Sequence, residues 1–226
     1  GFHLHDAHTA LRVASQNGAL VVFSNLPAGG SSANASPSAA GYSSDTKSFI
    51  TPFEIYKNGT DASPSCGGTA GSTRLILGTN RVWETIQGAI PRSSWYINSP
   101  VLTRPSSPLA DRAFINQLAY AVSTPANAIA GTNDGKVWIG FNLGGGTTNS
   151  ANWVDVTGSN SVLPNRPILD VATDPLDPLI GYAAVGGFDQ NTPATPGHVY
   201  RVECTAGCAS FTWRDVSGNL PDIPAN

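Results

Sequence analysis

Two segments of this chain, each of about 50 residues, repeat the same order of apolar runs and turns, and each has a tryptophan near its end. The first runs from residue 116 to 164 and the second from residue 168 to 221. Trp153 and Trp213 are equivalent, and Trp95 precedes Trp153 by a similar interval in a weaker earlier copy. A unit that recurs at such a spacing is typical of folds built from similar elements packed side by side.

Each repeat contains four short apolar runs that are separated by turn-forming residues. The runs of the first repeat are 118–122, 128–132, 137–139 and 153–156, and their counterparts in the second are 168–172, 181–185, 199–201 and 213–216. Asn133, Asp134 and Gly135 predict a type I′ hairpin turn between two of these runs, because such turns need positive φ at both central residues. Four short strands per unit and a recurring buried tryptophan predict an all-β fold, a β-propeller of four-stranded antiparallel blades.

A single propeller domain is predicted over residues 1–226, with about three to four blades. Residues 112–167 and 168–226 are the two clear blades, residues 75–111 a weaker one, and residues 1–74 one or more irregular blades with long Ser/Gly-rich loops. Because propeller rings usually hold four to eight blades, we expect an incomplete ring. Further blades would come from missing sequence or from another chain, and the sequence is either a fragment or a processed chain.

The first part of the chain is expected to be the least regular. Residues 28–46 and 58–73 are predicted to be long polar loops, because they carry little apolar surface to pack. Residues 49–56 between them favour a strand. Residues 9–23 favour a hairpin whose turn lies at residues 16–18.

Composition excludes several classes of function. Charged residues make up 12% of the chain, and the formal net charge is −3. Proteins that bind nucleic acid by electrostatic attraction need a basic stripe, which this sequence does not contain. No apolar run approaches the ~20 residues of a membrane-spanning helix. We therefore expect neither a nucleic-acid partner nor a membrane span.

The three cysteines and one N-glycosylation triplet give information on the cellular compartment of the protein. Cys204 and Cys208 flank three residues that suit a tight hairpin loop, and directly opposed residues of an antiparallel pair are close enough for a disulfide. We predict that these two are bonded and that Cys66 is either free or paired outside this chain. Asn58 begins an Asn-Gly-Thr triplet, which is either an N-glycosylation site or an ordinary turn. A disulfide favours an exported protein, located outside the cell, at its surface or in the periplasm.

Several short motifs of the repeats resemble those of the bacterial BNR-repeat (Asp-box) propellers. They lie at residues 78–80, 131–135, 174–178, 196–200 and 213–221. That superfamily includes sialidases, xyloglucanase-like glycosidases and sortilin-type receptors, so the resemblance implies a propeller that acts on or binds glycans, or binds proteins. The family's Asp-box reads Ser-x-Asp-x-Gly-x-Thr-Trp. Here the tryptophans Trp153 and Trp213 remain, while the Ser and Asp that tie the turn are absent.

Candidate catalytic groups are few, since glycoside hydrolysis needs two carboxyl groups about 5–9.5 Å apart. Asp170 lies in an apolar run that is expected to be an innermost strand, where it either faces the central channel or caps a turn. Asp155 and Asp215 occupy equivalent repeat positions, which favours a structural role. No arginine triad of the sialidase kind can be assigned, so sialidase activity is not expected.

His3, His5, Asp6 and His8 form the one cluster of the sequence that is rich in metal ligands. His3 and His5 would share one face of a strand, and imidazoles suit Zn²⁺, Cu²⁺ or Ni²⁺. The same residues also suit an exposed polar edge of a blade. Apart from a divalent metal at this cluster, no cofactor is expected.

We predict an exported, non-catalytic propeller module that binds a protein or a glycan, or that serves as an accessory subunit of a surface assembly. The alternative is a fragment of a xyloglucanase-like glycoside hydrolase whose catalytic acids lie partly outside this chain. In both cases the five tryptophans are expected to pack in blade cores rather than to stack on sugars.

Overall fold

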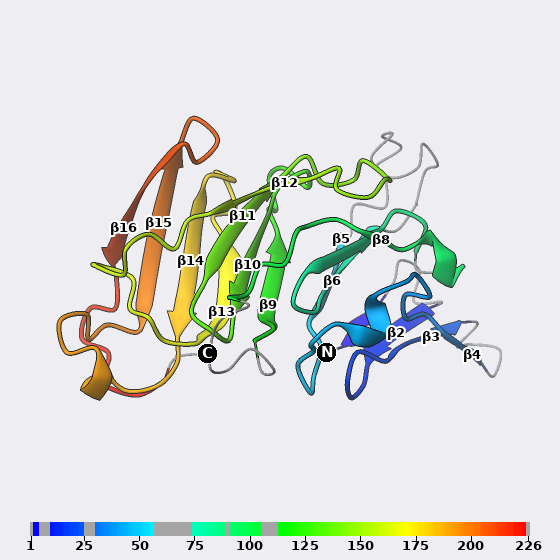
Figure 1. Ribbon diagram of the computed structural model, residues 1–226, viewed down its shortest axis with the longest axis horizontal. Helices are drawn as coiled ribbons and strands as arrows, with labels where there is room; N and C mark the ends of the chain where they lie inside the picture. Colours follow the sequence, from blue (N-terminus) through cyan, green and yellow to red (C-terminus); the bar gives the residue numbers. More distant parts are fainter. Residues whose placement is uncertain are drawn as a thin grey trace.

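The computed structural model describes residues 2–4, 10–24, 30–56, 74–88, 91–104 and 113–224. Their strands form four antiparallel sheets of four strands each. Figure 1 shows the sheets following one another in chain order, from the first in blue to the fourth in orange and red. The protein is therefore an unclosed β-propeller, and the predicted fold class is confirmed.

Each sheet takes its strands in chain order. The first consists of β1 (Phe2–Leu4), β2 (Ala10–Ala14), β3 (Leu20–Ser24) and β4 (Ser31–Asn34). The second consists of β5 (Phe53–Tyr56), β6 (Arg74–Gly78), β7 (Val82–Thr85) and β8 (Tyr96–Ile97). The third consists of β9 (Ile115–Tyr120), β10 (Ala128–Thr132), β11 (Val137–Phe141) and β12 (Asn152–Asp155). The fourth consists of β13 (Ile168–Thr173), β14 (Ile180–Val185), β15 (Val199–Thr205) and β16 (Ser210–Asp215).

One recurring hydrogen bond ties each blade to the preceding one. The indole N–H of Trp95, Trp153 and Trp213 donates to the backbone carbonyl of Ala35, Asn98 and Val156, at 2.8, 2.9 and 2.6 Å. Each acceptor is the first residue after the last strand of the preceding sheet. The predicted core position is confirmed for these three and for Trp83, which are all buried, whereas Trp138 is half-buried.

Two glycines let neighbouring sheets approach closely. A Cβ at Gly131 on β10 would lie 2.4 Å from Cγ2 of Ile168 on β13, and a Cβ at Gly78 on β6 would lie 2.8 Å from Cγ2 of Ile115 on β9. Gly78 and Gly131 are equivalent positions of the repeat. The inner strand of each following blade thus packs its aliphatic side chains onto a bare backbone position of the sheet before it.

A cluster around a buried ion pair of the second sheet joins this sheet to the third. Arg74 Nη2 lies 3.0 Å from Glu84 Oε1, and both side chains are 0% exposed. The hydroxyl groups of Tyr96 and Tyr120 donate to Glu84 at 2.9 and 3.3 Å, and the amide of Gly144 donates at 3.0 Å. Burial, reinforced by the charge of Glu84, raises the pKa of both tyrosines above their usual value of 10.0. Because Tyr120 lies on β9 and Gly144 follows β11, this cluster links the two blades.

Sequence and structure differ most in the first part of the chain. The second sheet takes its inner strand from β5, which pairs with β6, so the predicted blade boundary at residue 75 falls inside this sheet. Residues 30–46, predicted as part of a polar loop, instead contain β4 and the turn η3 (Tyr42–Ser44). They pack because the Tyr42 ring meets the Trp83 ring edge-on at 5.5 Å and Asp45 accepts the Trp83 indole N–H at 2.8 Å. Residues 58–73 lie outside the described residues.

Two predicted hairpin turns had different outcomes. Asn17 and Gly18 have φ of 54° and 83°, which is the pattern of a type I′ turn at the predicted place. At residues 133–135 the type I′ prediction was wrong, because only Gly135 has a positive φ, of 83°. Asp134 accepts hydrogen bonds from the Thr132 hydroxyl at 2.5 Å and from the Arg104 amide at 2.6 Å. Thr132 and Lys136 close the hairpin with their backbone groups, so its loop consists of the three residues 133–135, a loop length that places its last residue in the left-handed region.

Cys204 and Cys208 form a disulfide, with their Cα atoms 4.6 Å apart. They are not directly opposed, however, since Cys204 pairs with Phe211 and the hairpin of β15 and β16 extends to Thr205 and Ser210. The residues between the strands turn sharply, with positive φ at Ala206, Gly207 and Cys208. The bond therefore closes the turn itself instead of crossing a strand pair.

Candidate functional site

The edge at which the inner strands begin brings together several side chains that could hold a ligand. The inner strands β5, β9 and β13 contact one another in this order. A groove of about 180 Å³ lies where β5 and β9 begin, and Thr51, Glu54, Asn116 and Gln117 are among its lining residues. The groove thus holds one carboxylate, two amides and one hydroxyl within a small volume, of which Asn116 Nδ2 donates to the Ile168 carbonyl at 2.8 Å and Thr51 Oγ1 to the Ser48 carbonyl at 3.1 Å.

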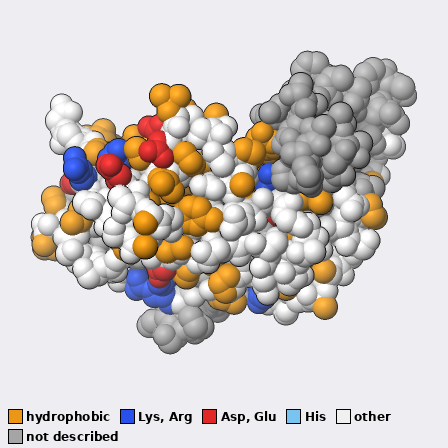
Figure 2. Space-filling view, turned by 90° about the horizontal axis from the view of Figure 1, so that it is seen from above, with side chains coloured by type: hydrophobic (Ala, Val, Ile, Leu, Met, Phe, Trp, Pro, Cys, Tyr) orange, Lys and Arg blue, Asp and Glu red, His pale blue; other side chains and the backbone are white. Residues whose placement is uncertain are grey.

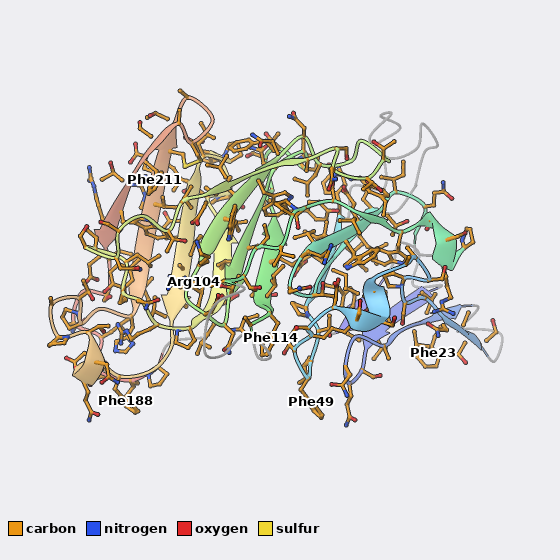
Figure 3. The ribbon with its side chains drawn as sticks, viewed as in Figure 1. Phe23, Phe49, Arg104, Phe114, Phe188 and Phe211 are labelled. Atoms are coloured by element: carbon orange, nitrogen blue, oxygen red, sulfur yellow. A yellow bond between two sulfur atoms is a disulfide. The ribbon has the colours of Figure 1, made fainter. Side chains whose placement is uncertain are left out.

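An apolar rim stands beside this groove. Phe49 and Ile50, which precede β5, are 60% and 61% exposed, and Ile50 also lines the groove. The backbone carbonyl of Phe49 accepts the amide N–H of Asn17 at 3.0 Å, which fixes the segment against the first sheet. Figure 3 shows Phe49, Phe114 and Phe188 along the same lower edge of the molecule. A sugar ring presents apolar C–H faces and hydroxyl groups at its edge, and an apolar rim beside polar groups complements both.

The inner strands β9 and β13 have a bulge at equivalent places, at Asn116 and Leu169. The side chain after each bulge accepts a hydrogen bond from the next backbone amide. Gln117 Oε1 accepts from Leu118 at 3.1 Å, and Asp170 Oδ1 accepts from Val171 at 2.8 Å. One oxygen of Asp170 therefore caps the bulge, which is one of the two roles considered from the sequence. A catalytic role for Asp170 stays a prediction.

Other carboxylates of the repeat hold turns. Asp155 Oδ1 accepts from the Thr157 amide at 3.0 Å, and Asp215 Oδ1 accepts from the Ser217 amide at 2.8 Å. Burial alone would raise the pKa of Asp155, but its hydrogen bonds with Lys136 and Thr157 outweigh burial and lower this pKa. Both residues thus have the structural role that their equivalent positions predicted.

The metal cluster predicted from the sequence lies almost entirely outside the described residues. His5, Asp6 and His8 lie outside the described residues, as do Asn58 and Cys66. His3 lies on β1 opposite Arg12, and its side chain is outside the description. Within the described ranges, no group of three or more His, Cys, Asp or Glu side chains is arranged to hold a metal ion.

In the part of the chain that the structure describes, no helix is long and apolar enough to cross a membrane.

Sequence reasoning missed the groove. Glu54 and Phe49 fell in a segment predicted only as a strand, and Asn116 and Gln117 were not singled out. One feature of the sequence could have indicated the groove: Gln117 and Asp170 are polar residues at the same repeat position, each inside an otherwise apolar inner strand. Their side chains cap the backbone bulges of these strands, and no local sequence pattern predicts those bulges.

The sequence matches no protein-family model, and no curated protein matches it significantly. Among solved structures, the fold is similar to that of an ancestral GH74 enzyme, with a TM-score of 0.58 and 13% identity over 96% of this chain and 26% of that chain. It is also similar to the GH74 xyloglucanase from Xanthomonas campestris, with a TM-score of 0.52 and 14% identity over 91% of this chain and 27% of that one. The likeness shows the propeller fold, and this chain spans about a quarter of the length of those structures.

Proposed function

We propose that this chain is the glycan-binding part of an exported propeller protein, and that it binds a neutral β-glucan such as xyloglucan along the edge where its inner strands begin. The groove with Glu54, Asn116 and Gln117 beside the exposed Phe49 carries this proposal. The amides and the carboxylate hydrogen-bond to sugar hydroxyl groups, while Phe49 packs on the face of a ring. The choice of glucan is supported by the likeness to a structure described as a xyloglucanase.

A second candidate is that the chain is part of a glycoside hydrolase of the xyloglucanase kind. The observation that favours it is that the likeness covers nearly all of this chain but only 26% of a GH74 enzyme. The catalytic acids would then lie partly outside this chain, with Asp170 as the candidate within it. The BNR-repeat family, suggested by the short motifs of the repeats, is compatible with both candidates.

Export and a further blade belong to the same proposal. The disulfide of Cys204 and Cys208 supports an oxidising compartment, because such bonds are rare in reducing cytosol.

On the outer face of the fourth sheet, Ala184 occupies the position that Gly78 and Gly131 hold in the second and third sheets. Since the next blade covers both glycines, we infer that a further blade covers Ala184 in the same way.

The test compares binding with hydrolysis in the full-length protein. We expect xyloglucan to slow its migration in affinity electrophoresis, and Phe49→Ala to weaken this binding about fivefold or more while leaving the thermal melting point unchanged. Leu176→Ala is the matched control, because Leu176 is 87% exposed but lies in the connection from β13 to β14, at the other end of the inner strand. Equal binding by Phe49→Ala and the unaltered protein would remove the groove as the glycan site.

Release of reducing sugar from xyloglucan separates the two candidates. A pure binding module releases none. A hydrolase does, and Asp170→Asn then lowers the rate by several orders of magnitude if Asp170 is one of the catalytic acids. Full activity of Asp170→Asn would leave Asp170 with its bulge-capping role alone.

A further inference from the structure

A second cavity lies away from this groove, between the first sheet and the turns η3 and η5 (Arg92–Ser94). Its volume is about 440 Å³, which is within the range of small-molecule sites. Asn17, Ser38 and Ser43 supply polar groups to its wall, and Tyr42 supplies an aromatic ring. The cavity is therefore large and polar enough for one sugar ring.

Two cations face this cavity. Lys47, one of the few lysines of the chain, donates through Nζ to the carbonyls of Tyr42 and Asp45, and Nζ lies 4.6 Å from the centre of the Tyr42 ring. Arg92 donates from Nε to the carbonyl of Ser36 at 2.8 Å. Within the described residues, the Nη groups of Arg92 have no hydrogen-bond partner. Arg92 is exposed, so the Nη side of its guanidinium can reach a ligand in the cavity.

No acidic residue is among the described residues that line the cavity. The neighbouring Asp45 has a side chain that is only 2% exposed, and Arg81 Nε lies 3.1 Å from its Oδ1. Its Oδ2 accepts from Thr79 and Trp83, each at 2.8 Å. Asp45 therefore pairs with Arg81 on the core side and acts on Lys47 only through space, and no carboxylate of the described cavity wall pairs with Lys47 or Arg92. Figure 2 shows how sparse charged side chains are on the visible surface, so a pair of cations in one cavity is a distinctive feature.

We propose that this cavity binds an acidic sugar, a hydroxyl-rich ring that carries one carboxylate. The carboxylate lies between Arg92 and Lys47, because a guanidinium binds a carboxylate through two parallel hydrogen bonds. The ring hydroxyls meet the side chains of Asn17, Ser38 and Ser43. This site is separate from the groove at the inner strands and does not depend on the glucan-binding proposal.

Isothermal titration calorimetry of the full-length protein tests the site with three probes: methyl β-D-glucuronide, methyl β-D-glucoside and inorganic sulfate. We expect the glucuronide to bind at least tenfold more tightly than either of the others. Arg92→Gln should weaken glucuronide binding about tenfold or more, since a charge-assisted hydrogen bond is lost. Arg201→Gln is the control, because Arg201 lies on β15 in the fourth sheet and pairs with Glu203 at 2.8 Å.

Three results would overturn the proposal: equal affinity for glucuronide and glucoside, sulfate binding as tightly as the glucuronide, or no effect of Arg92→Gln. As a second measurement that needs no variant, a rise in NaCl concentration should weaken glucuronide binding and leave glucoside binding unchanged. Xyloglucan binding should not respond to Arg92→Gln, so failure of this site and failure of the groove are distinguishable.

Discussion

Burial decides how much a single carboxylate contributes to the stability of the fold, as Glu84 and Glu203 illustrate. Glu84 is fully buried with Arg74 and takes part in several further hydrogen bonds, whereas Glu203 is 50% exposed and pairs with Arg201. Water screens the exposed pair, so its net contribution to stability is small. In the buried cluster, loss of one partner leaves an uncompensated charge in the core.

We therefore expect Glu84→Gln to lower the free energy of unfolding by about 3–5 kcal/mol, measured by urea denaturation. Glu203→Gln is the matched control and should leave it nearly unchanged, because water screens the exposed pair. Similar losses in the two variants would contradict the assignment of Glu84 as the link between the second and third sheets.

The tyrosines of the same cluster predict a pH dependence. Burial is the main cause that raises the pKa of Tyr96 and Tyr120 above 10.0, and the charge of Glu84 adds to it. Near pH 10 and above, the unfolded chain releases these protons while the folded protein retains them, so stability is complete below about pH 10 and falls as pH rises further. In Tyr96→Phe this fall should be shallower by about 1.4 kcal/mol per pH unit, measured by urea denaturation between pH 9 and 11.5. An identical slope in the variant would show that Tyr96 does not contribute.

At the scale of elements, turn chemistry was only partly readable from the sequence. The turn at residues 16–18 and the turn at residues 133–135 both contain Asx and Gly residues, yet only the first has the paired positive φ values. The difference is one of loop length: residues 133–135 form a three-residue loop that Thr132 and Lys136 close, with only Gly135 at positive φ. The local pattern predicts that the chain turns here, whereas the loop length depends on which residues of the two strands pair.

The hairpin of β15 and β16 carries the next prediction. Because the disulfide of Cys204 and Cys208 closes a loop of only a few residues, it removes little entropy from the unfolded chain. The double variant Cys204→Ser, Cys208→Ser should lower the free energy of unfolding by about 2 kcal/mol. Reduction of the unaltered protein with dithiothreitol should have the same effect, and a much larger loss would mean that the bond also supports the packing of Trp213.

At the scale of the whole molecule, the second and third blades each have a glycine on the face against which the next blade packs. Ile168 and Val171 of β13 pack onto Gly131, and Ile115 and Leu118 of β9 pack onto Gly78. The corresponding place on the fourth sheet is a small, largely apolar hollow that includes Ala172, Tyr182 and Ala184. A following inner strand with two aliphatic residues three positions apart would fit it.

If a further blade covers this hollow in the full-length protein, Ala184→Arg should destabilise it by several kcal/mol, since the substitution buries a charge and overfills the interface. Gly131→Arg is the positive reference, because Gly131 lies at the observed interface between the third and fourth sheets, and its loss of stability gives the size expected for a covered position. Ser210→Arg, at an exposed position of β16, is the control. A melting temperature of Ala184→Arg equal to that of the control would mean that the face is uncovered.

The all-β architecture, the four-strand blades and the buried tryptophans could be predicted from the sequence, because each follows from a periodicity or a spacing along the chain. The first blades were poorly predicted, since Tyr42 and Asp45 stand alone in a polar segment and pack only because Trp83 lies opposite them.

By itself, the sequence determined the last two blades and the places of their buried tryptophans, because apolar runs and their spacing act locally. Tertiary structure alone decided the rest: the pairing of Arg74 with Glu84, the groove at Glu54 and Gln117, and the cavity that Lys47 shares with Arg92. The residues of that cavity are far apart along the chain. Only the packing of one blade against the next brings their charges and hydrogen-bonding groups within reach of one ligand.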